Sequence, residues 1–148
     1  MGLTFEEFSL DQNWTTQGRT VTEGDVMSFC GLSGDFNPLH SDEEYCRSTP
    51  FQGRIAHGPL GLSMAIGLMS QLNLINYTAM ALLNLNWDFR APIMLNDTIH
   101  ARVNTSALRP AKSGNGIVTL RFEVVNQNDV VTQEGTATLL MKSAGSKA

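Results

Sequence analysis

The sequence predicts an α+β domain in which an antiparallel sheet of about five strands wraps around one long apolar helix. The helix is predicted at residues 58–72, where apolar side chains occupy nearly every side, so the rest of the chain must enclose it. Most other segments alternate apolar and polar side chains with period two and are separated by turn sequences, which is typical of antiparallel strands. A sheet that curls around the helix buries it.

The chain opens with a strand and a shorter helix. Residues 14–21 predict the strand. Thr22 and Asp25 have the spacing of a helix-capping pair, so a helix begins after Thr22. Apolar side chains then recur at helical spacing until Gly31 and Gly34 stop the helix, which places Asp35 at the helix end.

Four strands follow the long helix. Pro59 suits the first turn of that helix. Residues 83–90 alternate strictly, with leucine, tryptophan and phenylalanine on one face and asparagine, aspartate and arginine on the other. Three further alternating segments are separated by turns that contain proline, glycine and asparagine: residues 98–108, 117–126 and 130–141.

Length and charge indicate one domain without a nucleic-acid partner. The chain has 148 residues, of which 42% are hydrophobic, enough for an ordinary core without disulfides. The single domain spans residues 1–148, with its core at about 12–141 and a loose tail at 142–148. The ten lysines and arginines are scattered and the net charge is -4, so neither a nucleic acid nor an anionic membrane is expected to bind.

Cysteine use and hydropathy predict a cytoplasmic protein. Cys30 and Cys46 fall in segments with helical patterns, and residues 1–10 lack the basic start of a secretory signal, so both thiols are expected to be reduced. The longest apolar stretch is shorter than the roughly 20 residues that a membrane span requires. No contact with a membrane is therefore expected.

Residues 34–40, Gly-Asp-Phe-Asn-Pro-Leu-His, bring a carboxylate, an amide and an imidazole close together in the sequence. Asn37 and Pro38 form a turn. Asp35 and His40 therefore cannot lie along one helix, and the turn can fold them face to face. Such a pair can take a proton from water and return one to carbon. The alternative is an ordinary turn beside a solvated histidine, because Asp and Asn are common in turns.

The residues after His40 predict a second helix start. Ser41 and Glu44 have the spacing of a capping box, so His40 is expected just outside a helix. The positive end of that helix dipole disfavours an imidazolium, whereas the three carboxylates that follow favour one.

Three segments in this order resemble the MaoC-like dehydratases and R-specific enoyl-CoA hydratases of the hot-dog fold: residues 34–40, residues 55–58 (Ile-Ala-His-Gly) and residues 89–98, which begin Phe-Arg-Ala-Pro-Ile. The resemblance spans roughly residues 12–141, and its first segment is the most specific. It implies that Asp35 and His40 hold and activate a water molecule while Asn37 supports them. It also implies that the backbone N–H of Gly58 donates to the thioester oxygen.

The chemistry of hydration agrees with the implied role of Gly58. Adding water across an enoyl thioester places negative charge on the carbonyl oxygen, and an N–H at a helix start stabilises that charge. Pro59 brings no competing N–H. An ordinary helix start is the alternative explanation. His57 is adjacent but equally suits a structural role, so it stays outside the predicted catalytic set.

The resemblance implies a reversible hydro-lyase that interconverts trans-2-enoyl-CoA and (R)-3-hydroxyacyl-CoA, with Asp35 as base and His40 as its acid–base partner. A hot-dog acyl-CoA thioesterase and a non-catalytic acyl-thioester-binding domain are the alternatives. The expected ligand is an acyl-CoA or acyl-carrier thioester, with no cofactor other than the coenzyme A of the substrate. An open sheet edge predicts a homodimer or a higher homo-oligomer.

Other side chains carry weaker signals. Arg90, Arg109 and Lys112 are candidates for binding the phosphates of coenzyme A, although solvated surface charge explains them equally well. No histidine pair has the spacing of zinc ligands, so no metal is expected. Ser63 lacks the neighbours of a nucleophile elbow and is expected inside the packed helix.

Overall fold

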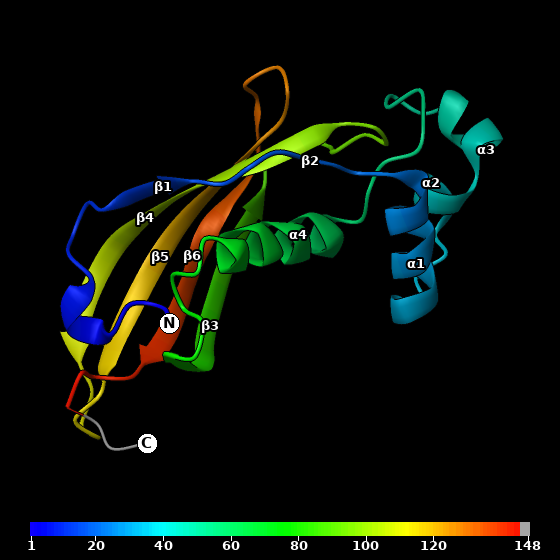
Figure 1. The fold of residues 1–148 in the computed structure, drawn as a ribbon. Helices are drawn as coiled ribbons and strands as arrows, with labels where there is room; N and C mark the ends of the chain where they lie inside the picture. The colour runs from blue at the N-terminus through cyan, green and yellow to red at the C-terminus, as the bar shows by residue number, and fades with distance from the viewer. Residues whose placement is uncertain (146–148) are drawn as a thin grey trace.

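Six strands form one antiparallel sheet in the described chain, and the four long ones are the predicted alternating segments (Figure 1). The structure, a computed structural model, describes residues 1–145. The sheet order is β1-β4-β5-β6-β3, and the short β2 also pairs with β4. The strands are β1 (Asn13–Thr15), β2 (Arg19–Thr20), β3 (Ala79–Phe89), β4 (Thr98–Pro110), β5 (Gly116–Val125) and β6 (Val131–Met141).

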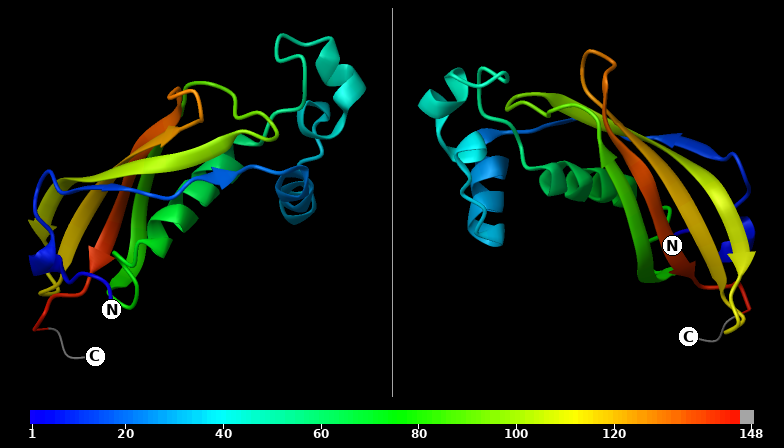
Figure 2. Two further views of the ribbon diagram at one scale, coloured as in Figure 1. Left: turned by 45° about the horizontal axis from the view of Figure 1, so that its top comes forward. Right: turned by 180° about the vertical axis from the view of Figure 1, so that it is seen from behind.

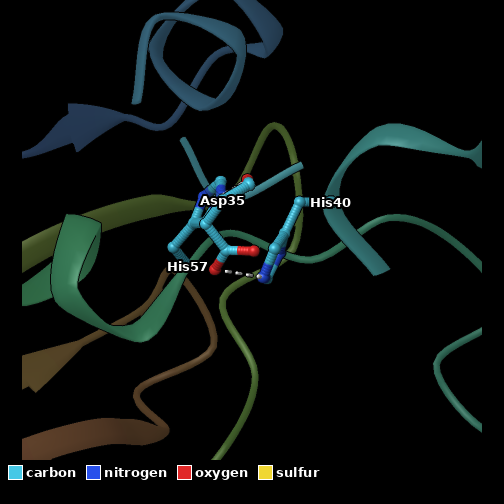
Figure 3. Close-up of side chains that lie close together, drawn as sticks. All are labelled: Asp35, His40 and His57. Carbon is cyan, nitrogen blue, oxygen red and sulfur yellow. Dashed lines mark hydrogen bonds and ion pairs between the residues drawn. The ribbon is translucent and has the colours of Figure 1, made fainter. Parts of the chain in front are cut away.

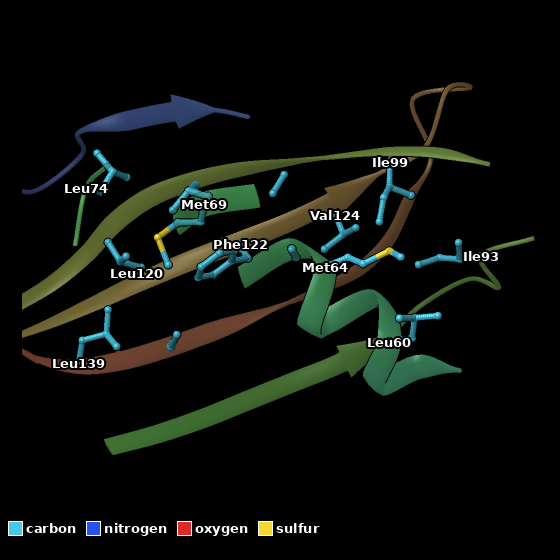
Figure 4. Close-up of a cluster of buried hydrophobic side chains, with 14 of the residues drawn as sticks. Leu60, Met64, Met69, Leu74, Ile93, Ile99, Leu120, Phe122, Val124 and Leu139 are labelled. Carbon is cyan, nitrogen blue, oxygen red and sulfur yellow. The ribbon is translucent and has the colours of Figure 1, made fainter. Parts of the chain in front are cut away.

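Helix α4 (Gly58–Gln71) lies along the face of the sheet that bends around it (Figures 1 and 2). Leu60 and Met64 of α4 point toward the sheet, where Val124 and Phe122 of β5 lie (Figure 4). All four side chains belong to one buried hydrophobic cluster. The predicted α+β class, an antiparallel hot-dog sheet wrapped around an apolar helix, is confirmed.

One side of α4 is open, although its sequence predicted full enclosure. Ser63 and Gly67 are exposed beside a groove of about 350 Å³ that lies between α4 and helix α1 (Glu23–Ser33). The Ser63 hydroxyl donates to the carbonyl oxygen of Pro59 at 2.8 Å. The prediction that Ser63 lies inside the packed helix is therefore wrong, because α1 does not cover this side of α4.

The strand predicted at residues 14–21 is divided into β1 and β2. At Thr16 the backbone N–H donates to the carbonyl oxygen of Ala101 at 2.9 Å. The Ala101 N–H donates in turn to the Thr16 side-chain oxygen at 2.8 Å. A side chain thus takes the place of a backbone acceptor, and regular pairing resumes only at Arg19.

Three helices form a group that extends beyond the sheet, next to the start of α4 (Figures 1 and 2). Helix α1 begins at the predicted capping box of Thr22 and Asp25 and ends at Gly34. The short helices α2 (Pro38–Ser41) and α3 (Glu43–Arg47) follow. Cys30 and Cys46 lie in α1 and α3 as predicted, and both are buried free thiols.

Both chain ends pack closer to the sheet than the sequence indicated. Phe8, which follows the 3-10 helix η1 (Phe5–Glu7), is buried in the core. The N–H of Phe5 donates to the carbonyl oxygen of Lys142 at 2.9 Å, and the N–H of Ala144 donates to Glu6 at 2.8 Å. The expected loose tail therefore does not include residues 142–144, and its residues 146–148 lie outside the described part of the chain.

Among residues 1–145, no helix has both the length and the apolar character needed to cross a membrane.

Candidate active site

Asp35 follows the end of helix α1, which is formed by Gly34 in a backbone conformation that favours glycine. Gly34 has a φ of 77°, in the left-handed region, and its N–H donates to the carbonyl oxygen of Cys30 at 2.8 Å. The N–H of Asp35 then donates to the hydroxyl of Ser33 at 3.2 Å. The chain turns sharply here, and Asp35 is placed at the end of α1 as predicted.

Asn37 supports the site by two hydrogen bonds. Its backbone N–H donates to Oδ1 of Asp35 at 3.1 Å. Its side-chain oxygen accepts from the N–H of Leu39 at 3.0 Å and so caps α2. Pro38 occupies the first turn of that helix, where its missing N–H has no cost. Asn37 thereby orients the Asp35 carboxylate and begins the helix that carries His40.

The capping box predicted at Ser41 and Glu44 is wrong. Helix α3 is capped one residue later, by Asp42, whose Oδ1 accepts from the N–H of Tyr45 at 2.9 Å. The Ser41 hydroxyl instead donates to the carbonyl oxygen of Phe36 at 2.9 Å. His40 therefore lies in the last turn of α2, and the positive end of a helix dipole does not act on it as expected.

Asp35 and His40 face each other across a short gap (Figure 3). Oδ2 of Asp35 lies 3.9 Å from Nε2 of His40. Nδ1 of His40 lies 2.7 Å from the carbonyl oxygen of Ile55, which can only accept, so Nδ1 carries a hydrogen, and in the neutral imidazole the lone pair is on Nε2. Two proton-accepting atoms therefore converge on one point. One water molecule can donate an O–H to each of them.

His57 contacts both of these residues. Its ring stacks on the ring of His40 with 3.7 Å between centroids. Its Nε2 lies 2.9 Å from the backbone carbonyl oxygen of Asp35, to which it donates. The ring of Phe29 and the thiol of Cys30 cover it, and only 2% of the residue is exposed. The sequence left His57 open between a site residue and a structural one, and only the folded contacts reveal this central position.

Gly58 occupies the first turn of α4, as predicted. The carbonyl oxygen of His57 accepts from the N–H groups of Leu60 and Gly61, at 3.1 and 3.3 Å. In a trans peptide the N–H points opposite to the carbonyl, so the Gly58 N–H points out of the helix start. A Cβ at this position would lie 2.8 Å from the ring of Phe89, so a larger residue would displace that ring.

A cavity of about 400 Å³ adjoins Gly58. Phe89, Arg90 and Gln133 line it together with Gly58 and Ile55, the residue that holds His40. The cavity therefore reaches from the start of α4 to the segment that supports the Asp35 and His40 pair.

The candidate phosphate-binding residues are not brought together. Arg90 borders the cavity, but its guanidinium forms ion pairs with Asp88 and Glu134, at 3.0 and 2.7 Å. Arg109 and Lys112 lie at the hairpin between β4 and β5, at the end of the sheet away from α1 and α2 (Figure 1). Of these three residues, Arg90 alone lines the cavity in the described part of the chain.

The fold creates a metal-compatible cluster that sequence spacing did not predict. Donor atoms of Asp35, His40 and His57 lie within 4.8 Å of one another. Two imidazoles and a carboxylate are a donor set that zinc accepts. In the described chain each imidazole donates one ring N–H to a backbone carbonyl oxygen, which fixes the orientation of both rings. Hydrogen bonds of this kind also orient metal-bound imidazoles, so the Asp35 and His40 pair is held in the same way with or without an ion.

Comparison with known proteins places this geometry in a family. Residues 7–128 match the MaoC like domain. An (R)-specific enoyl-CoA hydratase of Rhodospirillum rubrum is 32% identical over 141 residues, which cover 95% of this chain and 93% of that protein.

Solved structures agree with this match. A structure described as a monoamine oxidase regulatory protein from Archaeoglobus has a TM-score of 0.91 and 31% identity, covering 97% of this chain and 96% of that one. The (R)-hydratase of Aeromonas caviae has a TM-score of 0.79 and 28% identity, covering 90% and 97% of the two chains.

Proposed function

Because the chain belongs to the MaoC-like dehydratase family of hydro-lyases, we propose that it reversibly hydrates a trans-2-enoyl-CoA to the (R)-3-hydroxyacyl-CoA. The observation that carries this proposal is the convergence of Asp35 Oδ2 and His40 Nε2, 3.9 Å apart, with the lone pair of Nε2 unused. Both groups are placed to accept the two hydrogens of a single water molecule. General acid–base catalysis of water addition needs no more than such a pair.

The water oxygen attacks the β-carbon of the enoyl group, and Asp35 takes one of its protons. The other hydrogen stays on the oxygen and is hydrogen-bonded to His40 Nε2, which holds the water in position. The proton on Asp35 then passes to the α-carbon, so that one hydroxyl and one hydrogen have been added across the double bond. In the reverse direction the same groups remove water from the 3-hydroxyacyl thioester.

The Gly58 N–H stabilises the oxygen that becomes negative during this step. As the β-carbon gains the hydroxyl, electron density moves onto the thioester oxygen, and a fixed N–H donor lowers the barrier. Gly58 offers such a donor at the first turn of α4, where the helix leaves the N–H without an internal partner. The cavity beside Gly58 receives the thioester end of the substrate.

A homodimer is the proposed assembly. Strand β3 lies at the edge of the sheet and exposes Met80, Leu82, Leu83 and Phe89. An open edge with apolar side chains favours pairing with a second copy of the chain. The free, buried thiols of Cys30 and Cys46 support a cytoplasmic setting for this assembly.

The purified chain with crotonyl-CoA tests the proposed reaction. Loss of the enoyl thioester absorbance without release of thiol supports hydration. Release of free coenzyme A, detected by a thiol reagent in a parallel sample, would instead show a thioesterase. No change in either channel with both crotonyl-CoA and a crotonyl-loaded acyl carrier protein would contradict catalysis and favour a binding domain.

A further inference from the structure

Gln133 and Trp87 form a buried hydrogen-bond chain that ends on the backbone of Gly58. The indole N–H of Trp87 on β3 donates to Oε1 of Gln133 on the neighbouring β6, at 3.0 Å. Nε2 of Gln133 donates to the carbonyl oxygen of Gly58 at 3.1 Å. Only 2% of Gln133 is exposed. The sheet is thereby tied to the first turn of α4 through two side chains.

Two glycines leave space for the side chains of Trp87 and Gln133. A Cβ at Gly61 would lie 2.4 Å from Nε2 of Gln133 and 2.7 Å from the side chain of Ile93. A Cβ at Gly135 would lie 2.5 Å from the indole of Trp87, and it would also clash with the backbone oxygen of Asn86. A larger residue at Gly61 would displace Gln133, and one at Gly135 would displace both Trp87 and the backbone of β3. The surrounding sequence therefore accommodates the pair closely.

Core packing alone does not explain a glutamine at this position. Burying an amide costs free energy unless both of its ends are hydrogen-bonded, and a methionine would fill a similar volume without that requirement. Both ends of Gln133 are satisfied here, one by Trp87 and the other by Gly58. The arrangement thus uses a buried polar group to fix one backbone carbonyl.

The carbonyl oxygen that Gln133 holds belongs to Gly58, whose backbone has more conformational freedom than that of other residue types. Phe89 excludes a side chain at Gly58, and glycine adopts more backbone conformations than any other residue. On the preceding side, the N–H of Ala56 is held by the carbonyl oxygen of Ile93 at 2.8 Å. On the following side, Gln133 holds Gly58 itself. The peptide that carries the Gly58 N–H lies between these two anchors.

We propose that Gln133, oriented by Trp87, is a positioning residue that keeps the Gly58 N–H aimed at the thioester oxygen. This inference rests on the proposed hydratase function. Gln133 does not react with the substrate: it restrains the Gly58 backbone, so that the oxyanion donor is in place before the reaction begins.

Gln133→Met and Gln133→Glu test this role with crotonyl-CoA. Gln133→Met removes both hydrogen bonds with little change in volume, and kcat is expected to fall about tenfold while KM changes less than about twofold. Gln133→Glu differs in a useful way, because a protonated carboxyl group can still donate to the Gly58 carbonyl oxygen and accept from Trp87. An ionised carboxylate cannot donate. The rate of Gln133→Glu relative to wild type is therefore expected to rise as the pH falls, whereas that of Gln133→Met stays constant.

Trp87→Phe provides a second variant that leaves Gln133 in place. It removes only the hydrogen bond that orients the amide, so its loss of kcat is expected to be smaller than that of Gln133→Met. Thermal melting of each variant identifies unfolded protein. A folded Gln133→Met variant with wild-type kcat overturns the inference, as does a Gln133→Glu variant without the relative recovery at low pH.

Backbone dynamics separate this inference from the proposed reaction. If the wild-type protein does not hydrate crotonyl-CoA or its acyl-carrier counterpart, the proposed function fails. The NMR order parameter of the Gly58 N–H then still tests the restraint. A lower order parameter in Gln133→Met than in the wild type supports it, and an unchanged order parameter contradicts it.

Discussion

The ring of His57 lies on the ring of His40, with 3.7 Å between the two centroids and an angle of 26° between their planes. The same histidine donates from Nε2 to the backbone carbonyl oxygen of Asp35. One buried side chain therefore supports both residues that we propose to act on water. Gly58 follows it directly in the chain, so the candidate acid–base pair and the candidate oxyanion donor are linked through adjacent residues.

His57→Phe tests this support. Phenylalanine keeps a ring against His40 but removes the donor to Asp35, so kcat is expected to fall about tenfold. The unpaired carbonyl oxygen is expected to lower the free energy of unfolding by about 1–3 kcal/mol. Crotonyl-CoA hydration and denaturant unfolding measure the two effects. His57→Gln is the matched control, since it keeps an N–H donor and loses the ring. A fully active His57→Phe variant would contradict the proposed support.

Leu83→Lys on strand β3 tests the proposed dimer. A charge at this exposed apolar edge is expected to give a monomer, whereas a dimer is expected for the wild-type chain. Light scattering coupled to size-exclusion chromatography measures the two masses. Leu10→Lys adds the same charge at an exposed leucine outside β3 and should leave the dimer intact. A wild-type monomer at micromolar concentration would show that the open edge does not pair.

Asp25 predicts a specific acid response of stability. Burial alone would raise the pKa of the Asp25 carboxyl, but hydrogen bonds from Thr22 and the nearby Arg19 guanidinium hold this pKa below its usual value. Because its pKa is lower in the folded state, the ionised Asp25 carboxylate stabilises the fold at pH values above about 4. This contribution to stability is lost as the pH falls through the folded-state pKa.

Asp25→Asn is therefore expected to melt below the wild type at pH 7 by an amount equivalent to about 1 kcal/mol. The difference between the two melting temperatures should close in acid. Glu44→Gln, which changes an exposed carboxylate on α3, is the control and should show no such gap. A gap that persists unchanged at pH 2.5 would mean that the Asp25 charge is not its cause.

Removal of metal ions should leave the activity unchanged. Asp35, His40 and His57 could together ligate an ion, but the proposed water addition uses only the Asp35 and His40 pair and the Gly58 N–H. Dialysis against a chelator, followed by the crotonyl-CoA assay, measures this directly. Activity that disappears on dialysis and returns with added zinc would assign the cluster to a metal centre.

Patterns that depend on neighbouring residues were predictable from the sequence. The period of two in residues 83–90 and the apolar surface of residues 58–72 gave β3 and α4, because local geometry sets both repeats. The run from Asp35 to His40 also folds locally, around the Asn37 cap and Pro38. Its two ends meet because of that turn.

Contacts between distant segments were not predictable in the same way. Gln133 and Gly58 are 75 positions apart, and no periodic pattern indicates which buried amide meets which carbonyl. His57 likewise reaches Asp35 across 22 positions. The break at Thr16 and the Asp42 cap were missed for a different reason, since several polar side chains nearby could satisfy the same backbone groups and only the folded chain selects among them.

Hydration of crotonyl-CoA by wild type and Asp35→Asn, compared at equal concentration of folded protein, tests the central claim most directly. Asparagine keeps an oxygen that can accept from the Asn37 N–H, so the fold should be unchanged, while the proton acceptor is lost. We expect kcat to fall by at least about 100-fold, with the same melting temperature. Asp42→Asn, an amide that can still cap α3, should retain the wild-type rate. A folded Asp35→Asn variant that hydrates crotonyl-CoA at the wild-type rate would contradict the proposed mechanism.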